Sequence, residues 1–511
     1  IERNPEVGDS ANDGVRVDGA ELRATVVGEG GNLGFTQLGR IEYALGGGRI
    51  DTDAIDNSAG VDTSDHEVNI KILFQPLVAG GEVTLAERDA LLKEMTEEVA
   101  GLVLSHNRAQ ALALSLGQRA SRDDLELYAS LLDYLVGAAG LNPHVENLPS
   151  ARQLEERRRA GLGLTRPELA IMLAYVKMGL YRRLLETDLP SEPHLQHYLL
   201  DYFPQALRSR FPAAIEGHRL HREIVATVIT NTLVDQLGLG FVHKATRHNG
   251  VTPIEVVRAT LIALELIDAK RVRDHLDARA GSVPADAYYA AIDQLVAAVE
   301  GVVAWLLFND VGHGDFEAVV SSYRAPLQEL RASLDAYLPD GERVRYAAAT
   351  DDLEELGFER DDAALVASFA YLPDSAGIID VARQAGVPLT HAAERYYHLG
   401  ERLQLGWLRE SIEALASSGP WAQVALVGLV MDVRSVQRGL TAAYLAARRE
   451  EGAGMAAALD DFLKTAGSFK RYELALAQLQ EPGVLDLAAG SVLVRILEQA
   501  RATAHGAVGE G

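Results

Sequence analysis

The chain contains no cysteine. Disulfide bonds, thiolate metal sites and cysteine nucleophiles are therefore excluded, and the composition suits a reducing compartment. No apolar run approaches the roughly 18 residues that a membrane-spanning helix needs, and no signal peptide is visible. We therefore expect a cytoplasmic protein with no membrane partner.

Positive charge is also scarce, because 48 Lys and Arg stand against 73 Asp and Glu, for a formal net charge of −25. Such an acidic excess disfavours nucleic acids and anionic membranes as partners. The arginines at Arg152, Arg157, Arg158 and Arg159 alternate with glutamates. This run predicts a solvated helix face and not a phosphate site.

Familiar catalytic and metal motifs are missing as well. The sequence has no P-loop, nucleophile elbow or zinc motif. The pairs His218/His221 and His243/His248 lack an acidic third ligand nearby, so we expect solvated histidines and no metal site.

A chain of 511 residues predicts two or more domains. Beyond about residue 80 it is rich in Leu, Ala, Glu and Arg, and we expect a large all-α helical domain over 81–511. Four helix starts have the capping-box form, at Thr84–Glu87, Ser150–Gln153, Thr165–Glu168 and Thr252–Glu255. Residues 169–185 are apolar on nearly all sides, which predicts a helix in the middle of a bundle. Later helices are expected at about 285–308, 316–335, 375–384, 389–402, 407–415, 420–447, 454–465, 469–480 and 483–503.

Residues 1–80 differ from the rest, because short apolar runs alternate there with glycine-rich loops. A strand at Leu22–Val27 leads into glycines, and a helix at Thr36–Leu45 follows. A second strand, Arg49–Ile55, leads into a loop, and a helix over Ser64–Leu77 ends at Gly80-Gly81. This order predicts a partial Rossmann-like α/β segment in an otherwise mostly α protein. Its two loops could form adjacent walls of one crevice, although glycine-rich strand ends without a ligand are about equally common.

Each of the two loops contains a recognisable sequence motif. The first is Glu29-Gly30-Gly31-Asn32, and the second is Asn57-Ser58-Ala59-Gly60-Val61, followed by Ser64. They resemble the EGAN-type and NAGGV-x-x-S loops of glutamate dehydrogenases. Their surroundings resemble the large, multidomain NAD-dependent form, as do LTRPELAIMLAYVK (164–177) and EIVATVITNTLVDQLG (223–238). The resemblance implies the carboxyl-terminal portion of such an enzyme: the end of its NAD-binding domain (1–80) and its helical domain (81–511).

The resemblance also implies roles for particular residues. NAD would contact Gly30, Gly31, Asn32, Asn57 and Gly60, and L-glutamate or 2-oxoglutarate would contact Asn57, Val61 and Ser64. Ser64 has a second explanation as a helix N-cap, with Glu67 completing a capping box. Polar Asp65 and His66 depart from the small enzymes' pattern, and a structural role for His66 is favoured over a base.

The family's catalytic Lys and Asp and its phosphate-binding glycine turn lie upstream in glutamate dehydrogenases, and no counterpart occurs here. We therefore expect no catalytic residue in this chain and no dehydrogenase activity from it alone. The first residue, Ile1, precedes a strand, so the chain reads as the carboxyl-terminal part of a longer polypeptide. The expected partners are the remainder of that polypeptide and, in a homo-oligomer, further copies of it.

Two other functions stay open at this point. The chain could be a helical scaffold or oligomerisation module without catalysis, since most of it is helical. It could also belong to another NAD-linked amino-acid dehydrogenase, such as one for leucine or phenylalanine. The long helical region argues against the latter, because the small amino-acid dehydrogenases lack one.

Overall fold

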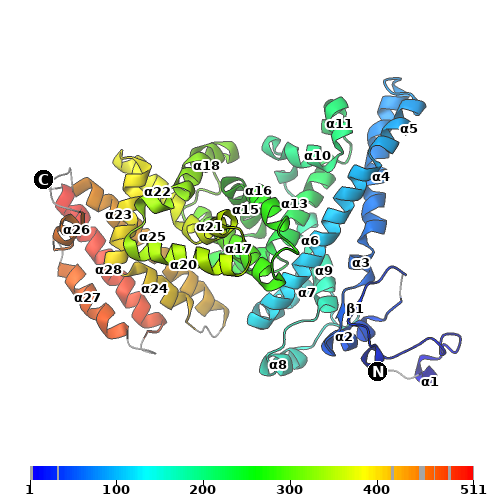
Figure 1. The fold of residues 1–511 in the computed structure, drawn as a ribbon, viewed down its shortest axis with the longest axis horizontal. Coiled ribbons are helices and arrows are strands. Elements are labelled where there is room, and N and C mark those ends of the chain that lie inside the picture. Colours follow the sequence, from blue (N-terminus) through cyan, green and yellow to red (C-terminus); the bar gives the residue numbers. More distant parts are fainter. Residues whose placement is uncertain are drawn as a thin grey trace. The chain divides into compact units, whose positions relative to one another are not determined.

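The computed structural model describes residues 4–31, 34–415, 419–447, 455–464, 467–480 and 485–509. They form two compact units, residues 1–244 and 245–511, and the division falls within helix α14 (Phe241–Asn249). Figure 1 shows that both units are built almost entirely of helices. The expected mostly α fold is confirmed, and each unit is considered by itself below.

Unit 1 combines one small sheet with a helical bundle. Its elements are α1 (Asn4–Val7), η1 (Gly19–Glu21), β1 (Val26–Val27), α2 (Gln37–Leu45), β2 (Arg49–Ile50), α3 (Asp53–Asp56), α4 (Ser58–Ala79), α5 (Leu85–Glu94), α6 (Thr96–Asp123), α7 (Leu125–Ala139), α8 (Ala151–Arg159), α9 (Arg166–Leu185), η2 (Leu189–Ser191), η3 (Pro193–Leu195), α10 (Gln196–Tyr202), α11 (Gln205–Arg210), α12 (Pro212–Glu216) and α13 (His221–Leu237).

The sheet of unit 1 has two short strands among the described residues. β1 and β2 pair in parallel, with Val26 opposite Arg49 and Val27 opposite Ile50. The expected strand over Arg49–Ile55 is wrong beyond Ile50, because α3 begins at Asp53. Asp53 is the first residue of this one-turn helix, where an acidic side chain is favoured by the positive end of the helix dipole.

The long helices of unit 1 begin where their capping signals predict. Thr84, Ser150 and Thr165 each form a capping box with the residue three positions later. Helix α9 packs against α2, α6, α7 and α13, which confirms its expected place in the middle of a bundle. Its outer side is not fully covered, however, since Met178 is 40% exposed.

Unit 2 is entirely helical apart from one isolated bridge, within its described residues. Its elements are α15 (Pro253–Ile267), α16 (Ala269–Asp277), α17 (Ala285–Phe308), α18 (Phe316–Ala332), α19 (Leu334–Tyr337), α20 (Asp340–Glu355), α21 (Arg360–Ser368), η4 (Phe369–Tyr371), α22 (Leu372–Ala385), α23 (Leu389–Arg402), α24 (Leu405–Glu413), α25 (Pro420–Ala447), α26 (Met455–Leu463), α27 (Gly467–Leu479) and α28 (Leu487–Gly509). α15 begins with the fourth expected capping box, Thr252–Glu255. The nine later helices predicted between 285 and 503 are also present, with ends that differ by up to about six residues, whereas no helix was predicted for α20 and α21.

Two stretches of unit 2 are long and apolar enough, by length and composition, to cross a membrane: Ala285–Phe308 and Arg360–Ala385. The bent pair His221–Leu237 and Phe241–Asn249 passes the same test when it is taken together. The statement that no apolar run approaches membrane length was therefore wrong. Inside unit 2 these two stretches pack as core helices, with 56% and 78% of their most apolar windows buried.

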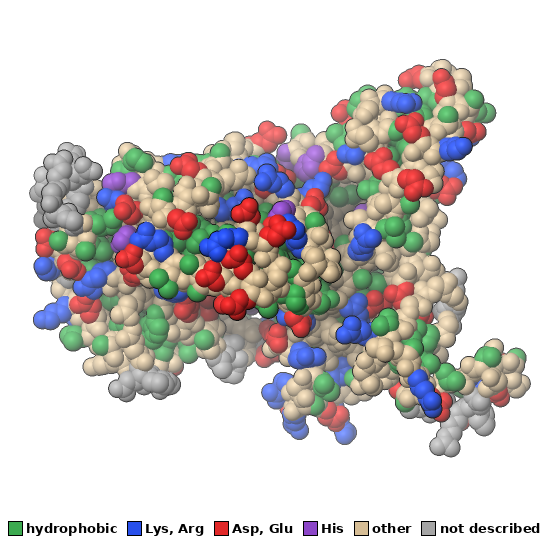
Figure 2. All heavy atoms as spheres, viewed as in Figure 1, with side chains coloured by type: hydrophobic (Ala, Val, Ile, Leu, Met, Phe, Trp, Pro, Cys, Tyr) green, Lys and Arg blue, Asp and Glu red, His purple; other side chains and the backbone are tan. Residues whose placement is uncertain are grey.

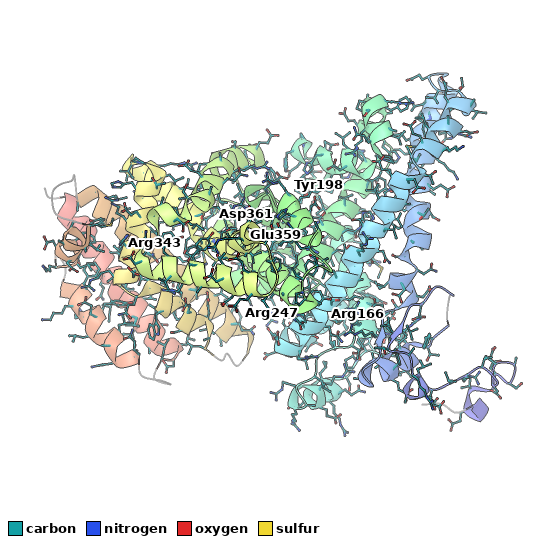
Figure 3. The ribbon with its side chains drawn as sticks, in the orientation of Figure 1. Arg166, Tyr198, Arg247, Arg343, Glu359 and Asp361 are labelled. Atoms are coloured by element: carbon teal, nitrogen blue, oxygen red, sulfur yellow. The ribbon has the colours of Figure 1, made fainter. Side chains whose placement is uncertain are left out.

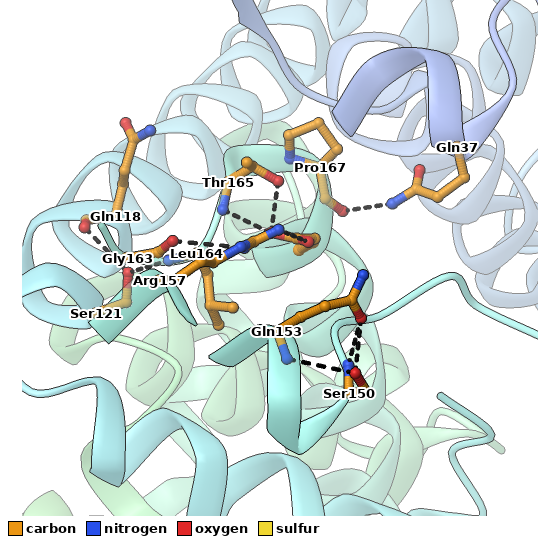
Figure 4. A network of polar contacts seen from close by, with 11 residues as sticks. Gln37, Gln118, Ser121, Ser150, Gln153, Arg157, Gly163, Leu164, Thr165 and Pro167 are labelled. Atoms are coloured by element: carbon orange, nitrogen blue, oxygen red, sulfur yellow. Dashed lines mark hydrogen bonds and ion pairs between the residues drawn. The ribbon is translucent and has the colours of Figure 1, made fainter. Parts of the chain in front are cut away.

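The basic run on α8 divides into two kinds of arginine. Arg152, Arg158 and Arg159 are exposed and pair with glutamates of their own helix, as expected for a solvated face. Arg157 was wrongly included in that face, because its side chain is only 12% exposed. It donates two hydrogen bonds to the buried carboxylate of Glu168, at 2.6 and 2.7 Å. Figure 4 shows Arg157 within the polar network that holds the start of α9.

The turn before α9 approaches α6 so closely that it requires glycine. A Cβ on Gly163 would lie 2.5 Å from Ser121 Oγ and 2.7 Å from the backbone nitrogen of Arg122. We expect Gly163→Ala to destabilise unit 1 by about 1–3 kcal/mol, because the chain must shift and lose the Leu164 N–H to Ser121 Oγ bond. At Gly137, in helix α7, a Cβ would meet no atom within 4 Å. Gly137→Ala should instead stabilise by about 0.5–1 kcal/mol. Urea unfolding of both variants measures the difference, and a shift of the same sign in both would contradict the argument.

Candidate cofactor and substrate site

The two glycine-bearing segments predicted to line a crevice lie beside each other. They follow neighbouring parallel strands, so both leave the sheet at the same edge. A direct bond joins them, since the backbone N–H of Glu29 donates to Asp56 Oδ2 at 2.9 Å. Burial raises the pKa of Asp56, although this amide bond lowers it in part. The segment after β1 is thus fixed to α3, immediately before Asn57.

Glu29, the acidic residue of the first segment, has a buried side chain. The carboxylate of Glu29 is 3% exposed and accepts two hydrogen bonds from the Arg40 guanidinium of α2, at 2.5 and 2.7 Å. Bidentate pairing of this kind fixes direction as well as distance. Glu29 therefore anchors the loop, and the residues that follow it, Gly30 and Gly31, are exposed to solvent.

Gly30 and Gly31 have open space beside them. A Cβ at either position would meet no atom within 4 Å, and neither residue has a positive φ. The chain itself therefore does not require glycine at these positions. An external group could approach this backbone closely. Asn32, the third predicted cofactor residue of this segment, lies outside the described residues.

The second motif is helical where a loop was expected. α4 begins at Ser58, directly after α3, with Asn57 at the junction between them. The helix was predicted to start at Ser64, and this was wrong. Ser64 lies in the second turn of α4, where its hydroxyl donates to the carbonyl of Gly60 at 3.1 Å. The N-cap explanation for Ser64 is therefore also wrong.

The predicted residues of the second motif cluster at the start of α4. The half-buried Asn57 lies over Gly60, with its Oδ1 3.6 Å from the position of a Cβ on that glycine. Val61 is 77% exposed, and Ser64 is exposed as well. The structure thus brings Asn57, Gly60, Val61 and Ser64 onto one helical start. Most of their surface remains accessible to another molecule.

Residues from later helices support this site, and no sequence pattern marks them. Asn107 of α6 donates to the carbonyl of Ile55 at 2.7 Å and to Ser58 Oγ at 2.9 Å. It therefore ties both sides of the α3–α4 junction to α6. These bonds join residues about 50 positions apart, so local spacing could not have predicted them.

A second anchor comes from the start of α9. Arg166 donates to both oxygens of Asp51, which directly follows β2, at 2.6 and 3.0 Å. Its third nitrogen donates to Ser115 Oγ of α6 at 2.7 Å. Figure 3 marks Arg166 among the helices of unit 1. The end of β2 is therefore held by a buried ion pair from the helical bundle.

Of the four histidines expected to be solvated, His218 is buried, whereas His221, His243 and His248 are partly exposed. His218 is 3% exposed, and its two ring nitrogens bond the carbonyl of Asn69 and the N–H of Leu220. Burial lowers the pKa of His218, which fits a neutral ring with both nitrogens in use. His66 is 1% exposed on the inner face of α4, and burial lowers its pKa as well. It does not lie at a helix start.

Two known protein families match this chain. A family described as "Glutamate dehydrogenase, C-terminal" matches residues 161–499. One described as "Bacterial NAD-glutamate dehydrogenase, catalytic domain" matches residues 1–117, which include both glycine-bearing segments. Since the first match covers more than half of the chain, the protein belongs to the glutamate dehydrogenase family. The resemblance read from the two motifs is confirmed.

Three curated relatives are each named NAD-specific glutamate dehydrogenase. The chain is 36% identical to the Halomonas elongata protein over 87% of its own length and 28% of the relative. It is 34% identical to the Pseudomonas aeruginosa protein over 99% of its length and 31% of the relative. The Mycobacterium tuberculosis protein is 36% identical over 86% of the chain and 27% of the relative. The chain thus spans less than a third of the relatives it matches.

Proposed function

We propose that this chain is the carboxyl-terminal part of an NAD-dependent glutamate dehydrogenase. In this reaction L-glutamate is oxidatively deaminated to 2-oxoglutarate and ammonia. The observation that carries the proposal is the adjacency of the two family motifs, joined by the Glu29–Asp56 bond at one edge of a parallel strand pair. The named relatives support it.

The two glycine-bearing segments suit contact with one side of a bound dinucleotide. NAD, when bound, accepts the hydride from the substrate's α-carbon. The open backbone at Gly30 and Gly31 would contact the nucleotide, together with Asn57 and Gly60. We propose Asn32 for the same contact. An uncharged amide such as that of Asn57 offers both a donor and an acceptor, which suits a ring amide or a ribose hydroxyl.

The substrate contacts are proposed at the exposed start of α4. Val61 presents its side chain to solvent, and Ser64 keeps acceptor capacity on its oxygen because its proton is donated to Gly60. An ammonium group on the substrate could therefore donate to Ser64 Oγ. Asn57, at the same helical start, would orient substrate and nicotinamide relative to each other.

The rest of the enzyme would come from the remainder of the polypeptide. We propose that residues 1–80 complete a Rossmann-like domain supplied mainly by that remainder, with the boundary at Gly80, the C-cap of α4. Residues 81–511 would form the helical domain, for which a role in homo-oligomer assembly is the second candidate function. We propose a cytoplasmic location, supported by the burial of the two long apolar stretches within unit 2. Acidic and basic side chains are intermixed on the face drawn in Figure 2, which supports the proposal that nucleic acids are not partners.

An activity assay tests the proposal directly. The longer polypeptide, incubated with NAD and L-glutamate, should form NADH, which is followed by its ultraviolet absorbance. The purified 511-residue chain should form none, because the catalytic Lys and Asp are expected elsewhere. Absence of NADH with the longer polypeptide would refute the enzyme assignment. Turnover by the 511-residue chain would refute the placement of the catalytic groups.

A further inference from the structure

Three potential metal ligands converge between α4 and α6, beside the proposed site but outside it. Asp62 and His66 are four residues apart on α4, so they share one helix face. His106 of α6 lies opposite, with its Nδ1 2.8 Å from Asp62 Oδ2. One ligand atom from each residue lies within 4.8 Å of the other two. The neighbouring helices α4 and α6 can be followed in Figure 1.

The buried histidine of this group has no hydrogen-bond partner. His66 is 1% exposed, and neither ring nitrogen makes a hydrogen bond. An unsatisfied buried polar group destabilises the folded state, so this ring calls for an explanation. Its Nε2 points toward the carboxylate and lies 4.0 Å from Asp62 Oδ1, which is too far for a hydrogen bond.

The surrounding residues fix the orientation of His66. The ring of Tyr202 on α10 stacks on the imidazole with centroids 4.5 Å apart. Tyr202 is itself held by a hydrogen bond from its hydroxyl to Asp65 Oδ2, at 2.8 Å, and by one from Asn69 Nδ2, at 2.9 Å. Asp65 is thus occupied by Tyr202, while Asp62 faces both histidines. The His66 ring is therefore fixed in orientation, although neither of its nitrogens makes a hydrogen bond.

We propose that Asp62, His66 and His106 bind a divalent transition-metal ion of the zinc type. Zinc bonds to imidazole nitrogen and carboxylate oxygen are about 2.0–2.2 Å long, so tetrahedral ligands lie about 3.3 Å apart. The distances from the two oxygens of Asp62, 2.8 Å from Oδ2 to His106 Nδ1 and 4.0 Å from Oδ1 to His66 Nε2, lie on either side of that value. An ion between the three residues would give His66 its missing partner.

The ligand set favours a particular class of ion. Two imidazoles and one carboxylate suit zinc, cobalt or iron(II), whereas magnesium and calcium prefer oxygen ligands throughout. His106 binds through Nδ1 as the tautomer with its proton on Nε2, and its side chain is 38% exposed. Three protein ligands leave a position for water. The ion would link α4 to α6 near Asn57, Val61 and Ser64 and so hold the start of α4 in place.

Cobalt(II) is the probe for this site, because its visible absorption reports nitrogen and oxygen ligation. The protein, purified without a polyhistidine tag, is titrated with cobalt(II) chloride. We expect visible bands that saturate at one ion per chain, disappear when Zn²⁺ is added, and persist in excess Mg²⁺. Zn²⁺ should also raise the midpoint of thermal unfolding. No activity is needed for either readout, so the result is independent of the proposed enzymatic function.

Matched variants separate a metal site from a packed histidine. Asp62→Asn keeps an acceptor for His106 but is a poor ligand, and His106→Gln replaces a partly exposed side chain. Each should weaken cobalt binding by at least about 100-fold, since even outer-shell changes cost 10–100-fold. Both should retain the wild-type circular dichroism. His144→Gln, at an exposed turn, should bind as the wild type does. Absence of bands in the wild type would overturn the proposal, and so would cobalt binding by Asp62→Asn or His106→Gln that is as tight as that of the wild type.

Discussion

Replacing Asn57 with Ala in the longer polypeptide is expected to lower kcat/KM for glutamate by about 100-fold or more. Loss of one preorganised hydrogen-bonding group that acts on the reacting centre has costs of this size. Asn57 stands at the α3–α4 junction, fixed from one side by the Glu29–Asp56 bond and from the other by Asn107. The backbone at Asn57 is therefore held in a defined place before any ligand arrives.

Two measurements distinguish this functional role from a structural one. Thermal unfolding of Asn57→Ala should remain cooperative, because the Glu29–Asp56 bond and the Asn107 bonds hold the backbone on either side of the junction. Asn249→Ala is the matched control: its amide donates within α14, to the carbonyl of Ala245, and its kcat/KM should equal that of the wild type. If Asn57→Ala keeps full kcat/KM while remaining folded, Asn57 contacts neither NAD nor substrate.

Replacing Glu168 with Ala is expected to cost about 3–5 kcal/mol of unfolding free energy, because it leaves a buried cation unpaired. The Glu168 side chain is 1% exposed and accepts both hydrogen bonds from Arg157. It also accepts from the backbone N–H and the hydroxyl of Thr165, at 2.8 and 2.7 Å. One carboxylate thus closes the capping box of α9 and neutralises the buried arginine of the α8 run.

Urea unfolding of the 511-residue chain measures this effect. Glu155→Ala is the control on α8: its carboxylate bonds exposed arginines, solvent screens the pairs, and little change is expected. Glu168→Gln should fall between the two, since an amide can still accept from Thr165 but leaves Arg157 unneutralised. Equal stability of the Glu155 and Glu168 alanine variants would show that burial of the pair contributes nothing.

Local signals in the sequence predicted helix starts well. Thr84, Ser150, Thr165 and Thr252 cap their helices because the cap and its partner lie within one turn of chain. The same pattern failed at Ser64, where Ser-x-x-Glu occurs inside α4 and the hydroxyl bonds Gly60. A local pattern cannot report that the helix has already begun at Ser58.

The residues that hold the site together escaped prediction for a different reason. Arg166 and Asp51 are 115 positions apart, and His106 and Asp62 are 44 apart. Neither pair produces a periodicity or a characteristic spacing that a single sequence would reveal. The candidate contacts Asn57, Gly60, Val61 and Ser64 were found only because a family motif marks them. Their scaffold became visible only in three dimensions.

The ion pair between Arg166 and Asp51 crosses from one matched family range to the other. Asp51 falls within residues 1–117, which match the catalytic family, and Arg166 within residues 161–499, which match the C-terminal one. The two ranges therefore match different families without being mechanically separate. Any displacement of α9 would pull on the strand end that leads to Asn57. The helical bundle is accordingly part of the frame that sets the position of the proposed cofactor contacts.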